Sequence, residues 1–409
     1  MIDRTIYDQL LISIRSYPVT VLTGARQVGK STEVYKFTKT HNFRYVSLDD
    51  IDERRLAEND PKYFMEKHGF PLIIDEVQYA PILMEVIEEL VNRKRLEEGS
   101  ANGMFILTGS QTFQLMQGVT QSMAGRAAIL KMEPLSNHEL RHTKEYPFLP
   151  DEKKLASTNF MKQSTQQVFE QIIKGFYPEI YSNETITSEM FYARYVSTYL
   201  DRDVNELINV KDKGRFHDFM QVLASLSGQQ INANHLSRVV GVSAPTIKDW
   251  LSVLETSGLI YFLQSYHDVS IVKRVVRSPK VYFADTGLAA YLAKINDAAT
   301  LEASAFAGGF METYVMNEIR KSYLNNGLAF SGMYYRDSNQ NEIDLILLEN
   351  AKLHLIEIKK GMSFTLNDVK AFKQLEKSLY TIGESCILCN TKKNYALEKD
   401  IYVLSVNTI

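Results

Sequence analysis

The sequence predicts an α/β protein built from several domains, with a parallel sheet in the first of them. In the first third, apolar runs such as VTVLTG and PLIIDE alternate with helical stretches, which is typical of parallel strands joined by crossover helices. Near the C-terminus, residues 341–361 (NEIDLILLENAKLHLIEIKKG) read as two strands joined by a tight turn. A chain of 409 residues is too long for one core of ordinary size, so we expect about two to four domains.

Changes of pattern divide the chain into four segments. Residues 1–145 carry the alternating strands and helices, and residues 146–225 are helical and rich in aromatic side chains. Residues 226–275 hold two helical stretches around the turn VGVS, and residues 276–409 contain the C-terminal hairpin. The linkers between the segments are short, so we expect the segments to pack together.

The composition is that of an ordinary globular protein, with 45% hydrophobic and 23% charged residues. The net charge of −3 means that any contact with nucleic acid would have to be local. No stretch approaches the run of about eighteen apolar residues that a membrane span needs, and the N-terminal stretch lacks the apolar core of a secretion signal. We therefore expect a cytoplasmic protein without a membrane partner.

The two cysteines, Cys386 and Cys389, form a C-x-x-C pattern inside ESCILCNT, which reads as a strand. A zinc site would need a second pair of ligands nearby, and a redox pair would need the start of a helix. Neither accompanies these cysteines. We therefore expect two ordinary buried thiols.

The segment VLTGARQVGKST follows an apolar strand and opens a helix, and it has the G-x-x-x-x-G-K-[ST] pattern of a P-loop. In such a loop, backbone N–H groups and the helix N-terminus face a phosphate. Lys30 would reach the β- and γ-phosphates of ATP, and Ser31 would coordinate Mg²⁺. The predicted contacts with ATP are Gly24, Ala25, Arg26, Gln27, Val28, Gly29, Lys30, Ser31 and Thr32.

Two further strands carry polar residues suited to the same site. PLIIDEVQ ends in Asp75, which would hold Mg²⁺ through water, and Glu76, which would orient the attacking water. The alternative is a buried strand followed by a solvated acidic turn. MFILTGSQ ends in Thr108, Ser110 and Gln111, which would lie beside the γ-phosphate if this strand neighbours the Asp75 strand.

Two arginines are candidates for contact with nucleotide. SMAGRA places Arg126 near the end of the first segment, where it could act as an arginine finger, either in cis or from a neighbouring subunit. A surface arginine is the alternative. Arg26, inside the P-loop, could equally touch nucleotide or pack on a neighbour.

The stretch INANHLSRVVGVSAPTIKDWL has the helix, turn and second helix of a helix-turn-helix, with Ser243 as the expected N-cap. The second helix would enter the major groove of DNA if it reads DNA, and packing against the core is the alternative. Its exposed residues, a thin set of donors, would be Ala244, Thr246, Lys248 and Asp249. The best local basic patch, which a solvated strand face also explains, consists of Lys273, Arg274, Arg277 and Lys280.

Motifs along nearly the whole chain, among them LTGARQVGKST, YVSLDD, EPLSNHEL, GFYPE and SPKVYFADTGLAAYL, together resemble the prokaryotic AAA-type ATPases that carry a C-terminal domain of unknown function. The resemblance implies ATP hydrolysis, a homo-oligomer, a winged helix and a terminal domain similar to restriction endonucleases. The predicted fold is then α/β, with an N-terminal P-loop ATPase and its parallel sheet (1–145), a helical segment (146–225), a winged helix-turn-helix (226–275) and a PD-(D/E)xK nuclease-like domain (276–409).

The C-terminal hairpin has the spacing that such a nuclease needs. An acid at the end of one strand and (D/E)-x-K on the next let carboxylates hold Mg²⁺ while the lysine positions water. Asp344, Glu357 and Lys359 satisfy this spacing, although no proline precedes Asp344. Upstream, Glu312 resembles the first acidic residue of archaeal Holliday-junction resolvases, and Glu318 is a weaker candidate. A satisfied buried network of acids and lysine is the alternative.

Two hypotheses of different class follow. In the first, ATP hydrolysis controls a nuclease that acts on DNA with Mg²⁺ or Mn²⁺ held by Glu312, Asp344 and Glu357. In the second, the chain is an ATP-driven binding or scaffolding module whose C-terminal domain recognises a partner or nucleic acid without cutting it.

Overall fold

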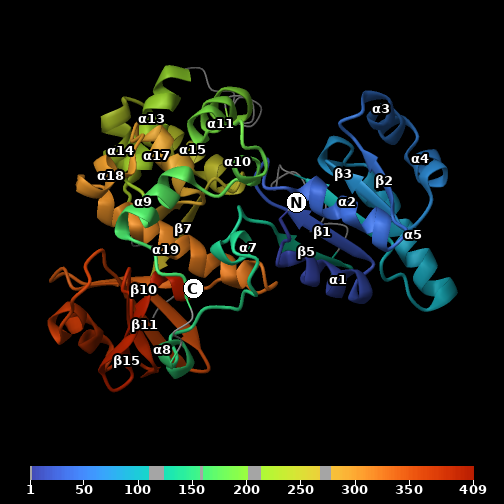
Figure 1. The fold of residues 1–409 in the computed structure, drawn as a ribbon. Coiled ribbons are helices and arrows are strands. Elements are labelled where there is room, and N and C mark those ends of the chain that lie inside the picture. The colour runs from blue at the N-terminus through green and yellow to red at the C-terminus, as the bar shows by residue number, and fades with distance from the viewer. Residues whose placement is uncertain (1, 110–123, 157–159, 201–212, 268–277) are drawn as a thin grey trace.

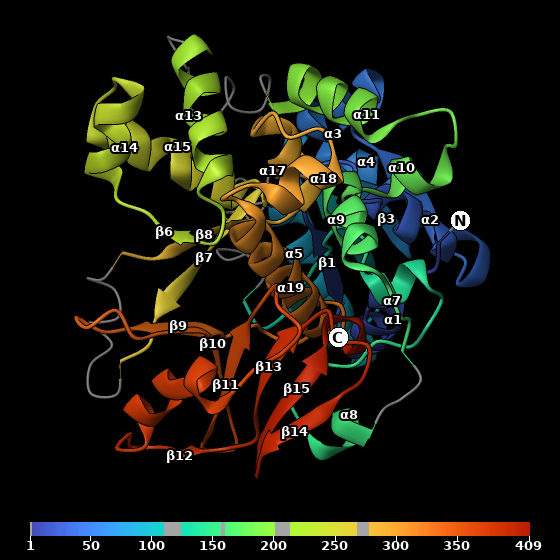
Figure 2. The ribbon, with the colours of Figure 1, turned by 60° about the vertical axis from the view of Figure 1, so that its left-hand side comes forward.

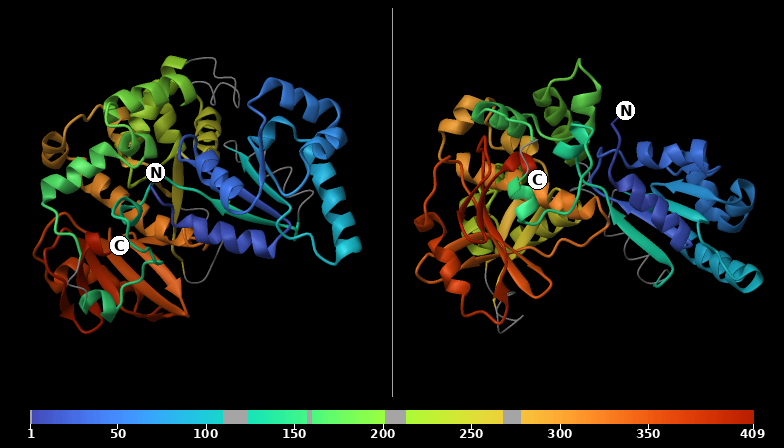
Figure 3. Two further views of the ribbon diagram at one scale, coloured as in Figure 1. Left: turned by 45° about the vertical axis from the view of Figure 1, so that its right-hand side comes forward. Right: turned by 60° about the horizontal axis from the view of Figure 1, so that its bottom comes forward.

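The computed structural model describes residues 2–109, 124–156, 160–200, 213–267 and 278–409. The N-terminal sheet with its helices, coloured blue, lies to one side of the middle helices and the C-terminal sheet, coloured green to red (Figure 1). The view about the horizontal axis in Figure 3 shows the same two bodies. No helix of the described ranges is long and apolar enough to cross a membrane.

The N-terminal body is a parallel sheet with the strand order β2-β3-β4-β1-β5, which confirms the parallel sheet predicted for the first segment. Its strands are β1 (Val19–Thr23), β2 (Arg44–Ser47), β3 (Leu72–Asp75), β4 (Phe105–Gly109) and β5 (Ala127–Lys131). The helices around it are α1 (Ile6–Ser16), α2 (Lys30–Thr40), α3 (Ile51–Asn59), α4 (Pro61–His68) and α5 (Leu83–Glu98). Strands β1, β3 and β4 are buried along their whole length, because helices cover both faces of the sheet.

The middle of the chain is helical, and its elements wrap around a second core (Figure 2). They are α7 (Asn137–Leu140), α8 (Glu152–Ala156), α9 (Thr165–Lys174), α10 (Pro178–Ser182), α11 (Ser188–Tyr195), η2 (Val196–Leu200), α13 (Lys213–Ser225), α14 (Ala233–Val240), α15 (Ala244–Thr256), α17 (Thr286–Leu292) and α18 (Ala298–Ala303). Helices α14 and α15 form the predicted helix-turn-helix pair, and Ser243 caps α15 by accepting a hydrogen bond from the N–H of Thr246. The identification of this region as a winged helix stays a prediction.

One mixed sheet runs through the middle and C-terminal segments in the order β14-β15-β13-β11-β10-β9-β7-β8-β6, with β12 beside β11. Its strands are β6 (Gln229–Gln230), β7 (Ile260–Ser265), β8 (Lys280–Phe283), β9 (Met333–Arg336), β10 (Glu342–Glu349), β11 (Lys352–Ile358), β12 (Thr381–Ile382), β13 (Ser385–Cys389), β14 (Tyr395–Glu398) and β15 (Ile401–Ser405). Because β7 pairs with both β8 and β9, the predicted boundary between residues 275 and 276 falls between two paired strands.

The C-terminal hairpin has the predicted form. Strands β10 and β11 are antiparallel, and Asn350 and Ala351 between them both have positive φ, as a tight two-residue hairpin turn requires. In β13, Cys386 and Cys389 are free and fully buried, which confirms the expectation of two ordinary thiols. Burial raises the pKa of both thiols, so neither carries appreciable thiolate at neutral pH.

Helix α19 (Ala307–Leu324) joins the two bodies, and its main contact with the N-terminal body is a buried ion pair. Arg320 Nη1 lies 2.7 Å from Oε2 of Glu133, which follows β5 by two residues. Burial by itself would raise the pKa of Glu133, but the charges of Arg320 and Lys131 outweigh it and lower this pKa to about 2. The pair therefore stays ionised although both side chains are buried.

The next turn of α19 makes a second connection. Glu318 Oε2 accepts a hydrogen bond of 2.8 Å from the N–H of Asn137, the first residue of α7. Lys321 Nζ donates to the carbonyl of Leu135 at 2.8 Å and pairs with Glu318. Glu318, the weaker metal candidate of the sequence, thus serves the contact between α19 and α7, because its position on the helix turns it toward Asn137.

We expect Arg320→Met to lower the free energy of unfolding by about 3–5 kcal/mol, because the change leaves the Glu133 carboxylate buried without its guanidinium partner. The double variant Arg320→Met/Glu133→Leu should recover part of this loss, since it leaves no unpaired carboxylate. Urea unfolding followed by circular dichroism measures both effects.

Exposed Arg93 on α5 supplies the control variant, Arg93→Met. Because the pKa of Glu133 is depressed in the folded protein, the contribution of the pair is present above about pH 4.5 and is lost as the pH falls toward 2. The difference between wild type and Arg320→Met should shrink in that window. Equal effects of Arg320→Met and Arg93→Met at pH 7 would contradict the role of the pair.

Candidate functional site

The P-loop connects β1 to α2 at the carboxyl edge of the parallel sheet. Gly24 has φ of 146°, and a Cβ there would lie 2.2 Å from the carbonyl oxygen of Met132, so only glycine lets the loop pass the chain that leaves β5. Lys30 is buried, and its Nζ donates to the carbonyls of Gly24 at 3.0 Å and Ala25 at 2.9 Å. The loop therefore holds its lysine beside the backbone that is expected to receive phosphate.

Asp75 and Thr108 lie together because β3 and β4 are neighbours in the sheet, as the sequence required for their shared role. The Thr108 hydroxyl donates to Asp75 Oδ1, and the backbone N–H of Glu76 donates to Thr108 Oγ1 at 3.3 Å. Glu76 has φ of 56°, so the chain turns sharply where the strand ends. Ser110 and Gln111 lie outside the described residues.

Two residues of the YVSLDD motif join this edge, and their roles were not assigned from the sequence. The Tyr45 hydroxyl donates to Asp75 Oδ2 at 2.7 Å. Burial, together with the charges of Glu76 and Asp75, raises the pKa of Asp49. A hydroxyl on β2 and three carboxylates thus face one edge of the sheet, and the motif's position after β2 was the available signal.

The donor set at this edge fits a nucleotide with its magnesium ion. It offers an ammonium at Lys30, a hydroxyl at Ser31 and a carboxylate at Asp75, the groups that P-loops use for phosphate and Mg²⁺. The clustered carboxylates also favour a cation, because burial and the charges of Glu76 and Asp75 already raise the pKa of Asp49.

Arg126 lies at the opposite edge of the sheet from the P-loop. Its carbonyl accepts a hydrogen bond from Val19, the first residue of β1, whereas the P-loop follows the last residue of β1. Its guanidinium contacts Asn92 at 3.0 Å and Glu88 at 3.4 Å, both on α5. The cis form of the predicted arginine finger is therefore wrong, because β5 runs parallel to β1 and begins at the far edge.

Arg4, which the sequence did not single out, supports the P-loop from the N-terminal segment. Its guanidinium donates to the carbonyl of Val28 at 2.7 Å and to the carbonyl of Glu133 at 2.6 Å. Its Nε lies 3.0 Å from Oε1 of Glu139. A lone arginine in MIDRTIY carries no motif, so only the folded contacts reveal that it ties the loop to the segment after β5.

The middle of the chain also reaches the P-loop. The nearest atoms to a Cβ built at Gly29 include Pro178 of the GFYPE motif and the guanidinium of Arg4, each within 4 Å. A Cβ built at Gly258, between α15 and β7, would likewise lie 3.5 Å from the backbone nitrogen of Ala25. Two positions in the helical middle are thus close to the loop.

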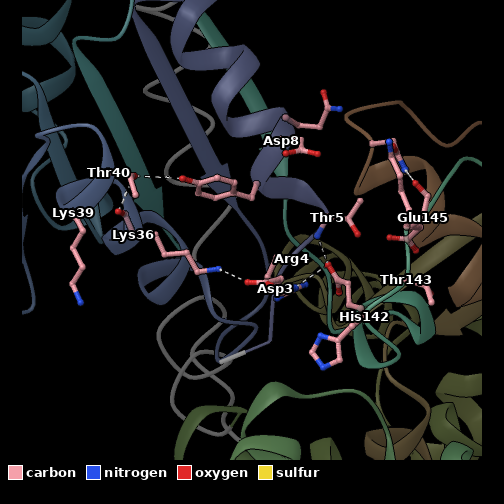
Figure 4. Close-up of a pocket in the computed structure, with 15 residues that line it drawn as sticks. Asp3, Arg4, Thr5, Asp8, Lys36, Lys39, Thr40, His142, Thr143 and Glu145 are labelled. Carbon is pink, nitrogen blue, oxygen red and sulfur yellow. Dashed lines mark hydrogen bonds and ion pairs between the residues drawn. The ribbon is translucent and has the colours of Figure 1, made fainter.

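A separate cavity of about 600 Å³ lies beside Arg4. Figure 4 shows Asp3 directed toward Lys36, with His142 and Glu145 on the opposite wall. Among the described residues that line it, none belongs to the P-loop. The cavity therefore borders the nucleotide edge at Arg4 without being the phosphate site.

The C-terminal candidates gather into one carboxylate cluster made of Glu312, Glu342, Asp344 and Glu357. Lys280 Nζ lies within it, 2.8 Å from Glu312 Oε1, 2.6 Å from Glu342 Oε1 and 3.5 Å from Asp344 Oδ1. Lys280 was expected in an exposed basic patch, and this was wrong: it is 2% exposed, because β8 lies between β6 and β7 and its lysine is enclosed by three carboxylates. The other three residues of that patch, Lys273, Arg274 and Arg277, lie outside the described residues.

The second half of the cluster surrounds Glu357. Lys359 Nζ lies 2.5 Å from Glu357 Oε1, and Asp344 Oδ2 accepts a hydrogen bond of 2.8 Å from the N–H of Ile358. Burial and the nearby charge of Asp344 raise the pKa of Glu357 to about 8, despite Lys359. Burial raises the pKa of Glu312 to about 7, although Lys280 acts against it. The predicted acids and lysine are thus brought together, with an additional lysine among them.

Helix α15 presents the residues predicted from the sequence for DNA contact. Lys248 and Asp249 are exposed, whereas Ala244 and Thr246 are half-buried. The buried face of the helix is formed by Ile247, Trp250, Leu251 and Leu254. The one lysine and one aspartate of that set cancel in charge. DNA contact by this helix stays a prediction.

Three segments of the chain match family models of known proteins. Residues 16–141 match the family model described as an AAA domain, so this part of the chain is similar to AAA domains. Residues 165–299 and 307–409 match two models described as domains of unknown function, DUF8612 and DUF4143.

Proteins of two bacteria are similar to most of the chain, at low sequence identity. An uncharacterized protein of Mycobacterium tuberculosis is 26% identical over 344 residues, covering 84% of this chain and 70% of the relative. An uncharacterized protein of Haemophilus influenzae is 24% identical, covering 70% of this chain and 72% of the relative. Among solved structures, a Walker-type ATPase of Pyrococcus abyssi has 14% identity and a TM-score of 0.44, covering 71% of this chain and 96% of that one.

We expect Arg4→Met to weaken ATP binding at least 10-fold, about 1.4 kcal/mol, because the Val28 carbonyl and the Glu139 carboxylate lose the group that fixes the P-loop. Isothermal titration with ATP and Mg²⁺ measures the dissociation constant. Exposed Arg15 on α1 gives the control, Arg15→Met. Unchanged affinity in folded Arg4→Met would show that the loop does not need this brace.

Proposed function

We propose that this protein binds and hydrolyses ATP at the P-loop, with Mg²⁺, and that hydrolysis controls a C-terminal domain that binds a partner without cutting nucleic acid. The observation that carries the first part is the convergence of Lys30, Asp75 and Thr108 on the carboxyl edge of the sheet. The match of residues 16–141 to an AAA domain supports it.

Each residue at this edge has a defined task in the proposal. Lys30 exchanges its two carbonyl partners for β- and γ-phosphate oxygens, and Ser31 with Asp75 would hold the magnesium ion. The ion neutralises charge on the phosphates. Thr108 and Tyr45 fix the Asp75 carboxylate through hydrogen bonds to its two oxygens. Glu76, held next to Thr108 by its backbone N–H, orients the attacking water.

Contacts between the two bodies would couple nucleotide binding at the P-loop to the C-terminal domain. A Cβ built at Gly258 would lie 3.5 Å from the backbone nitrogen of Ala25, so a rearrangement of the P-loop on nucleotide binding would displace the segment between α15 and β7. On the other side, Arg4 links the loop to Glu133, whose carboxylate pairs with Arg320 of α19. The same helix carries Glu312 of the carboxylate cluster.

The arrangement of the C-terminal domain favours the binding or scaffolding hypothesis over cleavage. Metal-assisted cleavage needs carboxylates that are open to a cation and water. Lys280 contacts three carboxylates of the cluster instead. Assembly into a homo-oligomer, with Arg126 acting on the nucleotide of a neighbouring subunit, is also part of the proposal, since Arg126 is partly exposed on the far edge.

We expect Lys30→Ala to abolish ATP hydrolysis and weaken ATP binding, because Lys30 supplies the main positive charge on the phosphates. Glu76→Gln should keep binding and lose at least 100-fold in turnover, in line with the roughly 10²–10⁴-fold effect of a general base. Titration calorimetry and phosphate release measure the two effects. Lys39→Ala, an exposed lysine on the same helix, is the control. Wild-type turnover by Glu76→Gln would remove the assignment of Glu76.

We expect the protein to leave plasmid, linear and branched DNA intact with Mg²⁺ or Mn²⁺, whether or not ATP is present, because the cluster is closed by Lys280. Gel electrophoresis after prolonged incubation decides this, beside a gel-shift assay for binding. Cleavage that disappears in Asp344→Ala would replace the scaffolding proposal by the nuclease hypothesis.

A further inference from the structure

Lys280 holds together three segments that are distant in the sequence. It lies on β8, next to the edge strand β6, while its carboxylate partners come from α19 (Glu312) and from β10 (Glu342 and Asp344). Its ammonium is within 3.5 Å of all three carboxylates, and its side chain is 2% exposed. A buried ammonium is costly unless it is paired, and here three acids pair it.

Each of these carboxylates also has a second donor. The Tyr282 hydroxyl donates to Glu312 at 2.5 Å, Arg336 lies 3.4 Å from Glu342, and the N–H of Ile358 donates to Asp344 at 2.8 Å. The ring of Tyr334 lies 5.7 Å from the ammonium. These three carboxylates are therefore paired with protein groups around a central positive charge, as the ligands of a cation site would be around their ion.

A divalent ion and the ammonium cannot occupy this position together. Mg²⁺ binds carboxylate oxygens at about 2.0–2.1 Å and keeps several waters. Lys280 Nζ already contacts the same oxygens of Glu312 and Glu342 at hydrogen-bonding distance, so two cations would face each other within a few ångströms. Among the described residues, no group of three or more His, Cys, Asp or Glu is arranged to hold a metal ion.

We propose that Lys280 is the resident cation of the carboxylate cluster and takes the position that Mg²⁺ was expected to hold between Glu312 and Asp344. The cluster is then a metal-independent clamp that fixes β8 to β10 and α19. The inference deepens the proposed non-cleaving role of the C-terminal domain and rests on it. Removing the ammonium should uncover a latent site for a divalent ion.

Glu357 differs from the other three carboxylates of the cluster in its partners. It pairs with Lys359, and its second oxygen is buried with no hydrogen-bond partner among the described residues. Lys280 does not contact it. A divalent ion admitted by loss of Lys280 would find the Glu357 oxygen beside Asp344, so Glu357 should contribute to the latent site.

The test measures Mn²⁺ binding to the nucleotide-free full-length chain. Electron paramagnetic resonance detects the Mn²⁺ that remains free. The quantity measured is the binding that depends on Asp344, obtained by subtracting an Asp344→Asn variant, so metal elsewhere on the chain cancels. We expect no Asp344-dependent binding in wild type up to about 1 mM Mn²⁺. In Lys280→Met we expect one equivalent of bound Mn²⁺, with a dissociation constant at least 10-fold below that concentration. Lys280→Arg and the exposed-lysine control Lys352→Met should both remain metal-free at this site.

Asp344-dependent Mn²⁺ binding by wild type would overturn the proposal, because a metal would then displace Lys280. Folded Lys280→Met that binds no Mn²⁺ would overturn it as well, because the ammonium would not mark a cation position. If Lys280→Met does not fold, the comparison of wild type, Lys280→Arg and Asp344→Asn still decides whether the native cluster admits a metal. Since none of these readouts measures cleavage or ATP turnover, the inference and the proposed function can fail separately.

Discussion

The structure depends on the pairing of buried charges along one helix. Helix α19 carries Glu312, Glu318, Arg320 and Lys321, and each is buried or nearly so. Because an ionised side chain out of water needs a partner, each residue fixes the neighbour that supplies one. The partners come from β8, α7 and the segment after β5, so this helix sets how the two bodies meet.

The P-loop edge follows from a different constraint, the direction of parallel strands. Strands β1, β3 and β4 all end at the same edge, so the loop after β1, Asp75 after β3 and Thr108 near the end of β4 must converge there. The same rule removes Arg126 from this edge, since it precedes β5 and therefore lies where the parallel strands begin. The groups at this edge come from strand ends and from the start of α2, and two positions of the helical middle, Pro178 and Gly258, lie close to the loop.

The two sites differ in how their negative charge is balanced. At the P-loop edge, Asp75, Glu76 and Asp49 lie near a loop whose lysine donates to its own backbone carbonyls. In the C-terminal cluster, the balancing charge is Lys280, part of the chain and buried. The proposals for the two sites rest on this difference.

The sequence by itself determined the features that depend on local order: the P-loop pattern, the alternation of strands and helices, the hairpin turn at Asn350 and the N-cap at Ser243. It also brought Asp344 and Glu357 together, because hairpin register follows from neighbouring residues. Only the tertiary structure decided where Lys280 points, which edge holds Arg126 and which body Glu318 faces. These features depend on which distant strands pair and on the partner that each buried charge finds. A lysine in a basic stretch gives the same sequence pattern whether its side chain is exposed to solvent or buried among carboxylates.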